Sequence, residues 1–491
     1  MANIKTLAGQ TAIYGASTIL GRLLNYLLVP LHTYIFKDPA QYGVVGELYA
    51  WVSLFMVLLL YGMETAFFRY SQIKEYKEKI FSTTATSLFI TSLLFILIVT
   101  GFAQNIADKL KYPDHPEYVI WLGIIIAVDA FSSVFFASLR QRMKAIKFAI
   151  VKATNILTNI IFNLFFLLLC PYLLQQNMAV DFVNVVYNPE IGVGYIFVSN
   201  LIASVVTLIL LLPDLCKVKF VFDIKLWKTM FIYALPLLVF NLAGIVNETM
   251  DRILLRRLSP PDIAQAQVGI YSACYKISIM MTLFVQAFKY AAEPFFFNKS
   301  KDGDAKQTYS DVMSIFVLVC SFIFLGIMLY MDIVQYFVGP SYRVGLPIVP
   351  ILLLANLLLG IFYNLSIWYK LTDKTIYGAC ISIVGAAITL LLNVILIPRI
   401  GYMGSAYATF VCYFSMALIS YLLGKRFYHV DYKIPKITLY ILFAVAIYLF
   451  STLFSIENFA LKMIIHTLFL SIYVIGILIM DKRYLKMVLK R

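Results

Sequence analysis

Long apolar stretches follow one another along the whole chain, and short breaks carrying charges, proline or glycine separate them. A helix that crosses the hydrocarbon core of a bilayer needs roughly 20 mainly apolar residues, which each of these stretches supplies. They lie at about 10–36, 42–68, 80–104, 117–139, 147–170, 191–212, 227–255, 266–296, 309–331, 344–369, 375–397, 402–424, 436–455 and 459–480. We therefore predict an all-α polytopic membrane protein with 14 transmembrane helices.

The composition leaves no room for a soluble domain beside these helices. Of the 491 residues, 62% are hydrophobic and only 13% are charged, whereas soluble domains are about 45–50% apolar and 25% charged. The longest break, at about 171–190, is too short to fold as a domain. The six cysteines are scattered without a paired spacing, so we interpret them as small hydrophobic residues.

The excess of basic residues follows the loops. The chain has 40 Lys and Arg against 25 Asp and Glu, a formal net charge of +15. Most of the basic residues lie in the N-terminus, in alternate loops and in the C-terminal tail. This is the distribution expected from the positive-inside rule, with both termini in the cytoplasm. The charge is therefore assigned to membrane insertion, and we expect no nucleic-acid partner.

The two halves of the chain carry weak copies of the same pattern. Gln41-Tyr42-Gly43 recurs as Gln267-Val268-Gly269, and Asn163 recurs as Asn393 at a nearly constant offset. The glycine pair that opens the sixth span also has a counterpart at the start of the twelfth. In order and spacing these matches predict two six-helix lobes related by a parallel repeat. The predicted divisions are 1–215 for spans one to six, 216–425 for spans seven to twelve, and 426–491 for the last two spans and the basic tail.

Charged residues inside the predicted spans carry most of the functional information. Placing one at the centre of a bilayer costs roughly 2.5–3.5 kcal/mol even on the insertion scale, so most of them should face the protein interior. The basic members are Arg22, Lys152, Arg252, Lys276 and Lys289. The acidic members are Glu47, Glu64, Asp129, Glu248, Asp251 and Glu293.

Helical phase and depth distinguish two of the cations. Arg22 and Lys276 lie near the middle of their spans and have no acidic residue within four positions. Arg22 also shares a polar stripe with Asn25. Cations at this depth with no acidic residue near them in the sequence indicate a hydrated cavity for an anionic ligand, and the arginine fork suits a phosphate. For Glu248 and Arg252, spaced i,i+4, an internal ion pair within the helix bundle remains an equal alternative.

The sequence lacks the motifs of the enzymes that such a membrane protein might contain. It has no GxxxxGK phosphate loop and no HExxH zinc motif. Asp181 and Glu190 are the only acidic pair in the longest outer loop, and they have no catalytic spacing. We therefore expect a transporter without enzymatic activity, organic cofactor or metal site.

Four segments of the chain carry a family resemblance. The first half contributes Gly21-Arg22-Leu23-Leu24-Asn25 and Tyr61-Gly62-Met63-Glu64. The second half contributes Asp251-Arg252-Ile253-Leu254-Leu255 and, after it, Val268-Gly269-Ile270-Tyr271-Ser272. These segments resemble the bacterial polysaccharide (Wzx-like) flippases of the multidrug, oligosaccharidyl-lipid and polysaccharide (MOP) exporter superfamily, and the likeness runs along essentially the whole chain. It implies MATE-like lobes around a central cavity lined by spans one, two, seven and eight.

The resemblance also implies a function. It predicts a flippase that moves an undecaprenyl-diphosphate-linked oligosaccharide, an O-antigen or capsule repeat unit, to the outer leaflet of the bacterial inner membrane. Its partners would be this lipid-linked glycan, membrane lipid and other glycan-assembly membrane proteins. The candidate substrate-binding residues are Arg22, Asn25, Arg252, Lys276 and Lys289.

The sequence leaves the energy source open. The membrane potential, H⁺ exchange and Na⁺ exchange are all compatible with acidic residues at membrane depth. The candidate ion-coupling residues are Glu47, Glu64, Asp129, Glu248 and Asp251. The alternative function is a MATE-type multidrug or small-molecule exporter of the same fold, which would favour a net acidic cavity.

Overall fold

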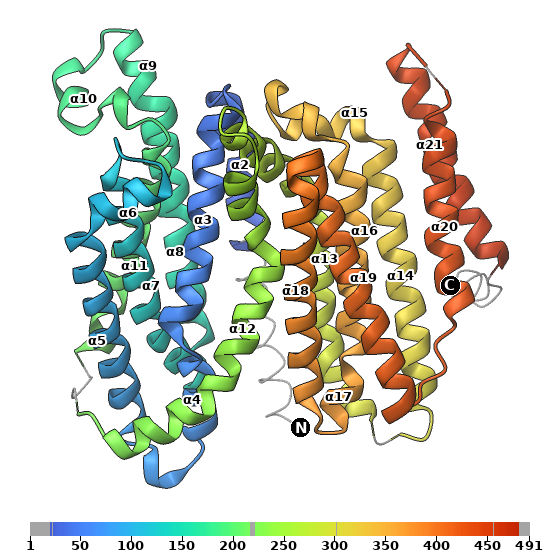
Figure 1. Cartoon of the computed structure of the whole chain (residues 1–491), viewed down its shortest axis with the longest axis horizontal. Helices are drawn as coiled ribbons and strands as arrows, with labels where there is room; N and C mark the ends of the chain where they lie inside the picture. The colour runs from blue at the N-terminus through green and yellow to red at the C-terminus, as the bar shows by residue number, and fades with distance from the viewer. Residues whose placement is uncertain (1–19, 22, 217–220, 301, 455, 481–491) are drawn as a thin grey trace. The chain divides into compact units, whose positions relative to one another are not determined.

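The computed structural model describes residues 20–21, 23–216, 221–300, 302–454 and 456–480, and these are mainly helical (Figure 1). Among them, 13 helices are long and apolar enough to cross a membrane. A shorter apolar helix, Leu23–Ile35, occupies the described part of the first predicted span. The helices therefore agree with the predicted all-α membrane fold and its 14 spans. Residues before Leu20, and Arg22 with them, lie outside the described part.

The chain packs as two compact units, Met1–Arg256 and Arg257–Arg491. The α-helices of the first unit are α2 (Leu28–Ile35), α3 (Pro39–Leu60), α4 (Met63–Tyr70), α5 (Ile80–Gly101), α6 (Ala103–Leu110), α7 (Pro116–Gln141), α8 (Ala145–Leu164), α9 (Cys170–Gln175), α10 (Val180–Val186), α11 (Gly194–Leu215) and α12 (Ile224–Leu258), whose last two residues fall beyond the boundary. A π-helical turn, Phe165–Leu169, joins α8 to α9, and short 3₁₀ turns cover Lys74–Tyr76 and Pro189–Ile191.

The second unit contains the remaining helices. They are α13 (Ala264–Lys299), α14 (Ala305–Leu329), α15 (Met331–Val334), α16 (Ile348–Leu365), α17 (Ile367–Leu371), α18 (Thr375–Ile400), α19 (Tyr402–Phe427), α20 (Ile434–Ser451) and α21 (Phe459–Met480). Two 3₁₀ turns, Gln335–Phe337 and Pro340–Gly345, lie between α15 and α16. The last pair, α20 and α21, packs on α14.

The same helix pairs recur in both units. In the first unit α11 packs against α7 and α8, and in the second unit α19 packs against α16 and α18. Counted as spans, these are the pairs four–six and five–six, then ten–twelve and eleven–twelve. Spans two and four also pack together (α3 with α7), as do spans eight and ten (α13 with α16). This repeated pairing agrees with the predicted parallel repeat.

Two glycines give the repeat a backbone signature. Gly192 has φ 52° and ψ −120°, and Gly401 has φ 56° and ψ −137°. Residues with a side chain rarely adopt this conformation, whereas glycine adopts it without a steric penalty. Each glycine turns the chain into the last helix of its six-helix set, α11 or α19. Gly192 and Gly401, which were matched in the sequence, therefore form the same kind of turn before a helix in both halves.

The membrane-facing and interior sides of the helices differ as expected for a bilayer. On α5 the large side chains of Leu93, Leu94 and Leu97 are exposed, and lipid is as apolar as these residues. Nearer the start of α5, Ser87 is buried and accepts a hydrogen bond from the Trp227 indole N–H at 2.7 Å. Its hydroxyl also lies 2.6 Å from the Tyr61 hydroxyl, and either of the two can be the donor. The interior is thus partly polar.

The first half of α12 belongs to the packing of the first unit. Leu226, Met230 and Ala234 are buried in the cluster formed by α4, α5, α7 and α8. A compact unit therefore extends beyond the predicted division at 215/216. That division follows the sequence repeat and stays a prediction, since packing units and repeat units need not coincide.

Candidate functional site

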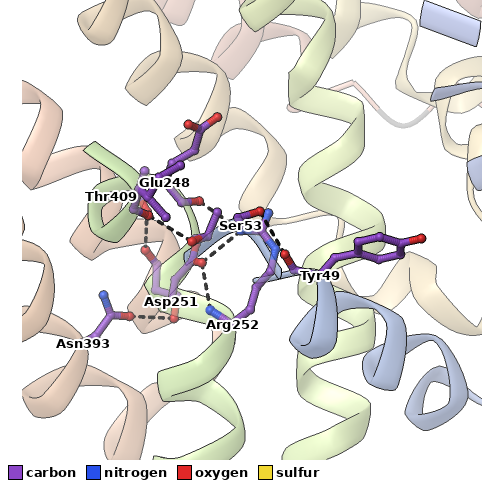
Figure 2. A network of polar contacts seen from close by, with 10 residues as sticks. Tyr49, Ser53, Glu248, Asp251, Arg252, Asn393 and Thr409 are labelled. Carbon is purple, nitrogen blue, oxygen red and sulfur yellow. Dashed lines mark hydrogen bonds and ion pairs between the residues drawn. The ribbon is translucent and has the colours of Figure 1, made fainter. Parts of the chain in front are cut away.

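Arg252 and Asp251 form a buried pair on α12. The Arg252 guanidinium donates to the Asp251 carboxylate at 3.1 Å and to the main-chain carbonyl of Glu248 at 3.0 Å, as Figure 2 shows. The two side chains are 11% and 3% exposed. The i,i+4 alternative considered for Glu248 and Arg252 is thus replaced by contact with the neighbouring acid. The Glu248 residue itself is exposed and forms no ion pair with a described residue.

Glu47 is fully buried where α3 meets the end of α6 and the end of α12. Its Oε2 accepts a hydrogen bond from the Tyr112 hydroxyl at 2.5 Å, and Arg256 Nε lies 3.5 Å from the same oxygen. Tyr112 follows α6 and Arg256 is on α12. Sequence analysis did not assign either of them, because a contact over such separations leaves no local pattern.

Glu64 and Asp129 lie in a second group of charges in the first unit. Glu64 on α4 is in an ion pair with Arg140 on α7, whose guanidinium also lies 5.0 Å from the centroid of the Phe68 ring. Asp129 on α7 interacts electrostatically with Lys152 on α8. This group combines two acids with two bases inside the membrane-spanning region, so it is close to neutral.

Asn25 is exposed and belongs to a row of polar side chains between the apolar helix Leu23–Ile35 and α8. Its Oδ1 accepts from Asn159 at 3.2 Å. Asn159 in turn accepts from the amide of Asn163, and Asn163 Oδ1 lies 2.8 Å from His32 Nε2. The row therefore runs from the exposed Asn25 to the buried His32, a residue that sequence analysis left without a role.

The second unit repeats one contact of this buried asparagine, while the partner on the neighbouring helix differs. Asn163 and Asn393 are both fully buried, and each donates at 2.8 Å to the carbonyl four residues earlier. Asn393 Oδ1 accepts from Ser405 on α19 at 2.8 Å, and Thr409 donates to the Ser405 carbonyl at 2.9 Å (Figure 2). The asparagine pair found in the sequence thus holds one helix pair together in each unit.

The two remaining candidate cations lie on α13. Lys276 is half-buried in the first half of the helix. Lys289 lies nearly three turns before Lys299, the last residue of the helix. Its ammonium is 4.4 Å from the centroid of the Tyr363 ring. Glu293, one turn further along, is 2.8 Å from Lys370 of α17. Arg22 falls outside the described residues, so its place in this arrangement stays a prediction.

The charged and polar side chains of the long apolar helices could bind a polar ligand or an ion. Among the described residues no group of three or more His, Cys, Asp or Glu side chains is placed to hold a metal ion. Charged and polar side chains lie on α3, α7 and α12 in the first unit and on α13 in the second, all within helices long and apolar enough to cross a membrane. Such residues in transmembrane segments typically mark pathways for substrates or ions.

Comparison with solved structures identifies the fold. A lipid II flippase MurJ in an inward closed conformation superposes with a TM-score of 0.67 over 94% of this chain and 98% of its own, at 14% identity. An inward-facing MATE family multidrug resistance transporter of the MOP superfamily gives 0.63 over 83% and 94%, also at 14% identity. The eukaryotic MATE transporter AtDTX14 gives 0.51 over 89% and 97%, at 13% identity.

Sequence comparison assigns the family. Among curated protein sequences none matches this chain. Residues 7–299 match the model of a family described as polysaccharide biosynthesis protein. The matched residues are more than half of the chain and reach from the first predicted span to the end of α13. The protein therefore belongs to the polysaccharide biosynthesis protein family and has the fold of the MOP superfamily transporters.

Proposed function

We propose that the protein is a flippase for a polyprenyl-diphosphate-linked oligosaccharide. The undecaprenyl-diphosphate-linked repeat unit of an O-antigen or capsule would move from the inner to the outer leaflet of the bacterial plasma membrane by alternating access. The observation that carries this proposal is the fold of a lipid II flippase over 94% of a chain that belongs to a polysaccharide biosynthesis family. The flippase fold and the polysaccharide biosynthesis family together favour a substrate in which a glycan is attached to a membrane lipid.

The proposed substrate contacts are cationic. A diphosphate in transit must leave water without losing its counter-charges, because an uncompensated anion at the bilayer centre is costly. Arg22, Arg252 and Lys276 would supply these charges, with Asn25 and Lys289 as further contacts. In the ground state Arg252 is held by Asp251, so substrate would compete with that carboxylate for the guanidinium.

Energy coupling is proposed to use the membrane potential or an exchanged H⁺ or Na⁺. The candidate carriers are Glu47, Glu64, Asp129, Glu248 and Asp251. Four of them interact with a basic residue of the first unit. Glu248 is the one that forms no ion pair with a described residue, which makes Glu248→Gln the first variant to test for loss of ion dependence.

A cell-based assay tests the substrate. Cells that depend on this protein should accumulate the lipid-linked glycan in the inner leaflet when Arg22 or Lys276 is changed to Ala. Lys425→Ala, which removes an exposed charge from the last turn of α19, is the matched control and should leave surface glycan unchanged. Normal surface glycan in both test variants would reject the cationic contacts.

The second candidate is a multidrug exporter, which the MATE-like fold supports. A cavity for organic cations should be net acidic, whereas the mid-membrane candidates Arg22 and Lys276 are basic. Binding of cationic dyes by the purified protein, with export from loaded vesicles, would favour this alternative. Absence of dye binding together with glycan accumulation in the Lys276→Ala cells would favour the flippase.

A further inference from the structure

A narrow pocket opens in the second unit where α13, α16 and α17 meet. Its enclosed volume is about 20 Å³, room for about one water-sized group such as a hydroxyl, and it is open at its mouth. Lys289 and Glu293 reach it from α13, Tyr363 and Asn364 from α16, and Lys370 from α17. The pocket therefore gathers three charged side chains and one amide in a part of the chain rich in apolar residues.

The pocket has an excess of positive charge. Glu293 is 2.8 Å from Lys370, and the Lys370 and Glu293 side chains are 25% and 39% exposed, which places this ion pair toward the mouth. Lys289 forms no ion pair or hydrogen bond with a described residue, and its ammonium lies 4.4 Å from the Tyr363 ring centroid. One carboxylate thus faces two ammonium groups. An ammonium has three N–H donors, and the ring contact on one side leaves donors for a ligand.

The inner wall of the pocket offers an acceptor without a donor. Asn364 is only 4% exposed, and its amide nitrogen donates to the Gly360 carbonyl at 3.1 Å. Its Oδ1 is buried and has no hydrogen-bond partner among the described residues. A buried acceptor left in this state costs free energy, so a ligand that brings an O–H or N–H group to Asn364 is favoured.

We propose that this pocket binds the phosphate of a membrane lipid together with a hydroxyl group carried beside that phosphate. The phosphate would lie at the mouth, where Lys289 and Lys370 donate to its oxygens, and the hydroxyl would donate to Asn364 Oδ1. The narrow interior favours a small alcohol over a complete sugar ring. Phosphatidylglycerol and the diphosphate end of a lipid-linked glycan share this chemistry.

Binding to the purified full-length protein tests the proposal. Native mass spectrometry in detergent would count bound lipid during titration with phosphatidylglycerol, which has head-group hydroxyls, and with phosphatidylethanol, which has the same charge and none. Phosphatidylglycerol should bind more tightly. Lys289→Gln and Lys370→Gln should each weaken it about tenfold, the loss expected for one hydrogen bond to a charged group.

The controls separate this site from general charge effects and from misfolding. Lys425→Gln makes the same charge change on the exposed side of α19 and should bind as the wild type does. Asn364→Leu, similar in size, should lower phosphatidylglycerol binding to the level of phosphatidylethanol. Each variant's melting temperature is measured in parallel, so that only folded protein is compared. Equal binding by Lys289→Gln and Lys425→Gln, or equal wild-type binding of the two lipids, would overturn the proposal.

Competition identifies the source of the phosphate. If undecaprenyl diphosphate carrying one sugar displaces phosphatidylglycerol from the wild type but not from Lys289→Gln, the site is a subsite for the transported lipid. If phosphatidylglycerol stays bound, the site belongs to bulk membrane lipid. Both results support the pocket. The readout is lipid binding and does not depend on transport. If the wild type binds phosphatidylglycerol as expected but transports no lipid-linked glycan, only the proposed function is contradicted.

Discussion

Charged side chains in the first unit are stabilised by specific partners, and for Glu47 and Glu64 these partners come from distant parts of the chain. Glu64 contacts Arg140, Asp251 contacts Arg252, and Glu47 lies beside Tyr112 and Arg256. Inside a bilayer such contacts replace the hydration that each charge would otherwise lose. An acid in this position can serve ion coupling only in a conformation that loosens its basic partner. We therefore expect each acid to be ion-paired in one conformation of the protein and available to a coupling ion in another.

The Tyr112 hydroxyl provides a direct measure of one such contact. Tyr112→Phe removes the donor to the fully buried Glu47 carboxylate and leaves the ring. We expect a loss of about 1.5–3 kcal/mol, as for hydrogen bonds to charged groups, measured by unfolding in detergent. Tyr118→Phe is the control, because Tyr118 donates to the neutral Ile191 carbonyl. Equal losses in the two variants would mean that Glu47 is not charged.

The repeated asparagines allow a test of symmetry at the same scale. Asn163→Leu and Asn393→Leu each remove a fully buried amide that joins two helices. Hydrogen bonds between transmembrane helices contribute about 0.6 kcal/mol on average and up to about 1.7 kcal/mol, so both variants should be destabilised within this range. Thermal unfolding of the two proteins checks this. A loss in only one of them would show that the asparagines are not equivalent.

At the scale of elements, the break between α3 and α4 is set by one glycine. Tyr61 ends α3 at φ 32°, and Gly62 follows at φ 74°. Gly62 also faces the start of α12: an added Cβ would lie 2.9 Å from the Ala234 carbonyl oxygen. The second predicted span thus consists of two helices, and a helix-period reading of 42–68 does not reveal the break.

Substitution of this glycine should therefore be costly. Gly62→Ala combines a left-handed backbone, about 1–2 kcal/mol for a residue with a side chain, with a clash against main chain. We expect the free energy of unfolding to fall by at least that amount, which is measured as a lower melting temperature. Gly326→Ala on α14, where an added Cβ meets nothing within 4 Å, should instead gain about 0.5–1 kcal/mol. A neutral Gly62→Ala would contradict the role of the break.

The start of α12 depends on an aspartate just outside the membrane-spanning helix. Asp223 Oδ1 accepts from the main-chain N–H groups of Lys225 and Leu226, both at 3.1 Å, and Oδ2 lies 3.2 Å from Lys79. The hydrogen bond from Leu226 and the Lys79 ammonium lower the pKa of Asp223 below its ordinary value. The folded state thus favours the charged carboxylate, so this stabilisation is complete above the ordinary aspartate pKa of about 3.9.

Acid titration checks this effect. As the pH falls through the lowered pKa of Asp223, the stabilisation should be lost. Asp223→Asn keeps a capping side chain but not the charge, so the melting temperatures of wild type and variant should differ near neutral pH and converge as the pH falls below the lowered pKa of Asp223. Asp223→Ala, which loses the cap as well, should remain less stable at every pH. A difference between wild type and Asp223→Asn that does not change with pH would exclude the charge contribution.

At the scale of the whole molecule, the fold was predictable because its signals are local or periodic. Long apolar stretches predicted the helices, and the glycines of the repeat reappear at Gly192 and Gly401 with the same backbone conformation. The contacts of the site were much less predictable. Lys370 and Asn364 face Lys289 only because α16 and α17 pack on α13, and no spacing in the sequence records such packing. Sequence analysis therefore found the charged residues but not their partners.

The orientation of the molecule is the remaining prediction at this scale. The basic residues of alternate loops predict both termini in the cytoplasm and the segment at about 171–190 outside. Green fluorescent protein fused to the C-terminus should fluoresce, and alkaline phosphatase, which is active only outside the cytoplasm, should be inactive there. Phosphatase inserted after Gln176, in the turn that follows α9, should be active. The reverse pattern would put the pocket formed by Lys289 and Lys370 at the outer end of its helices, where a lipid waiting to be moved outward could not reach it.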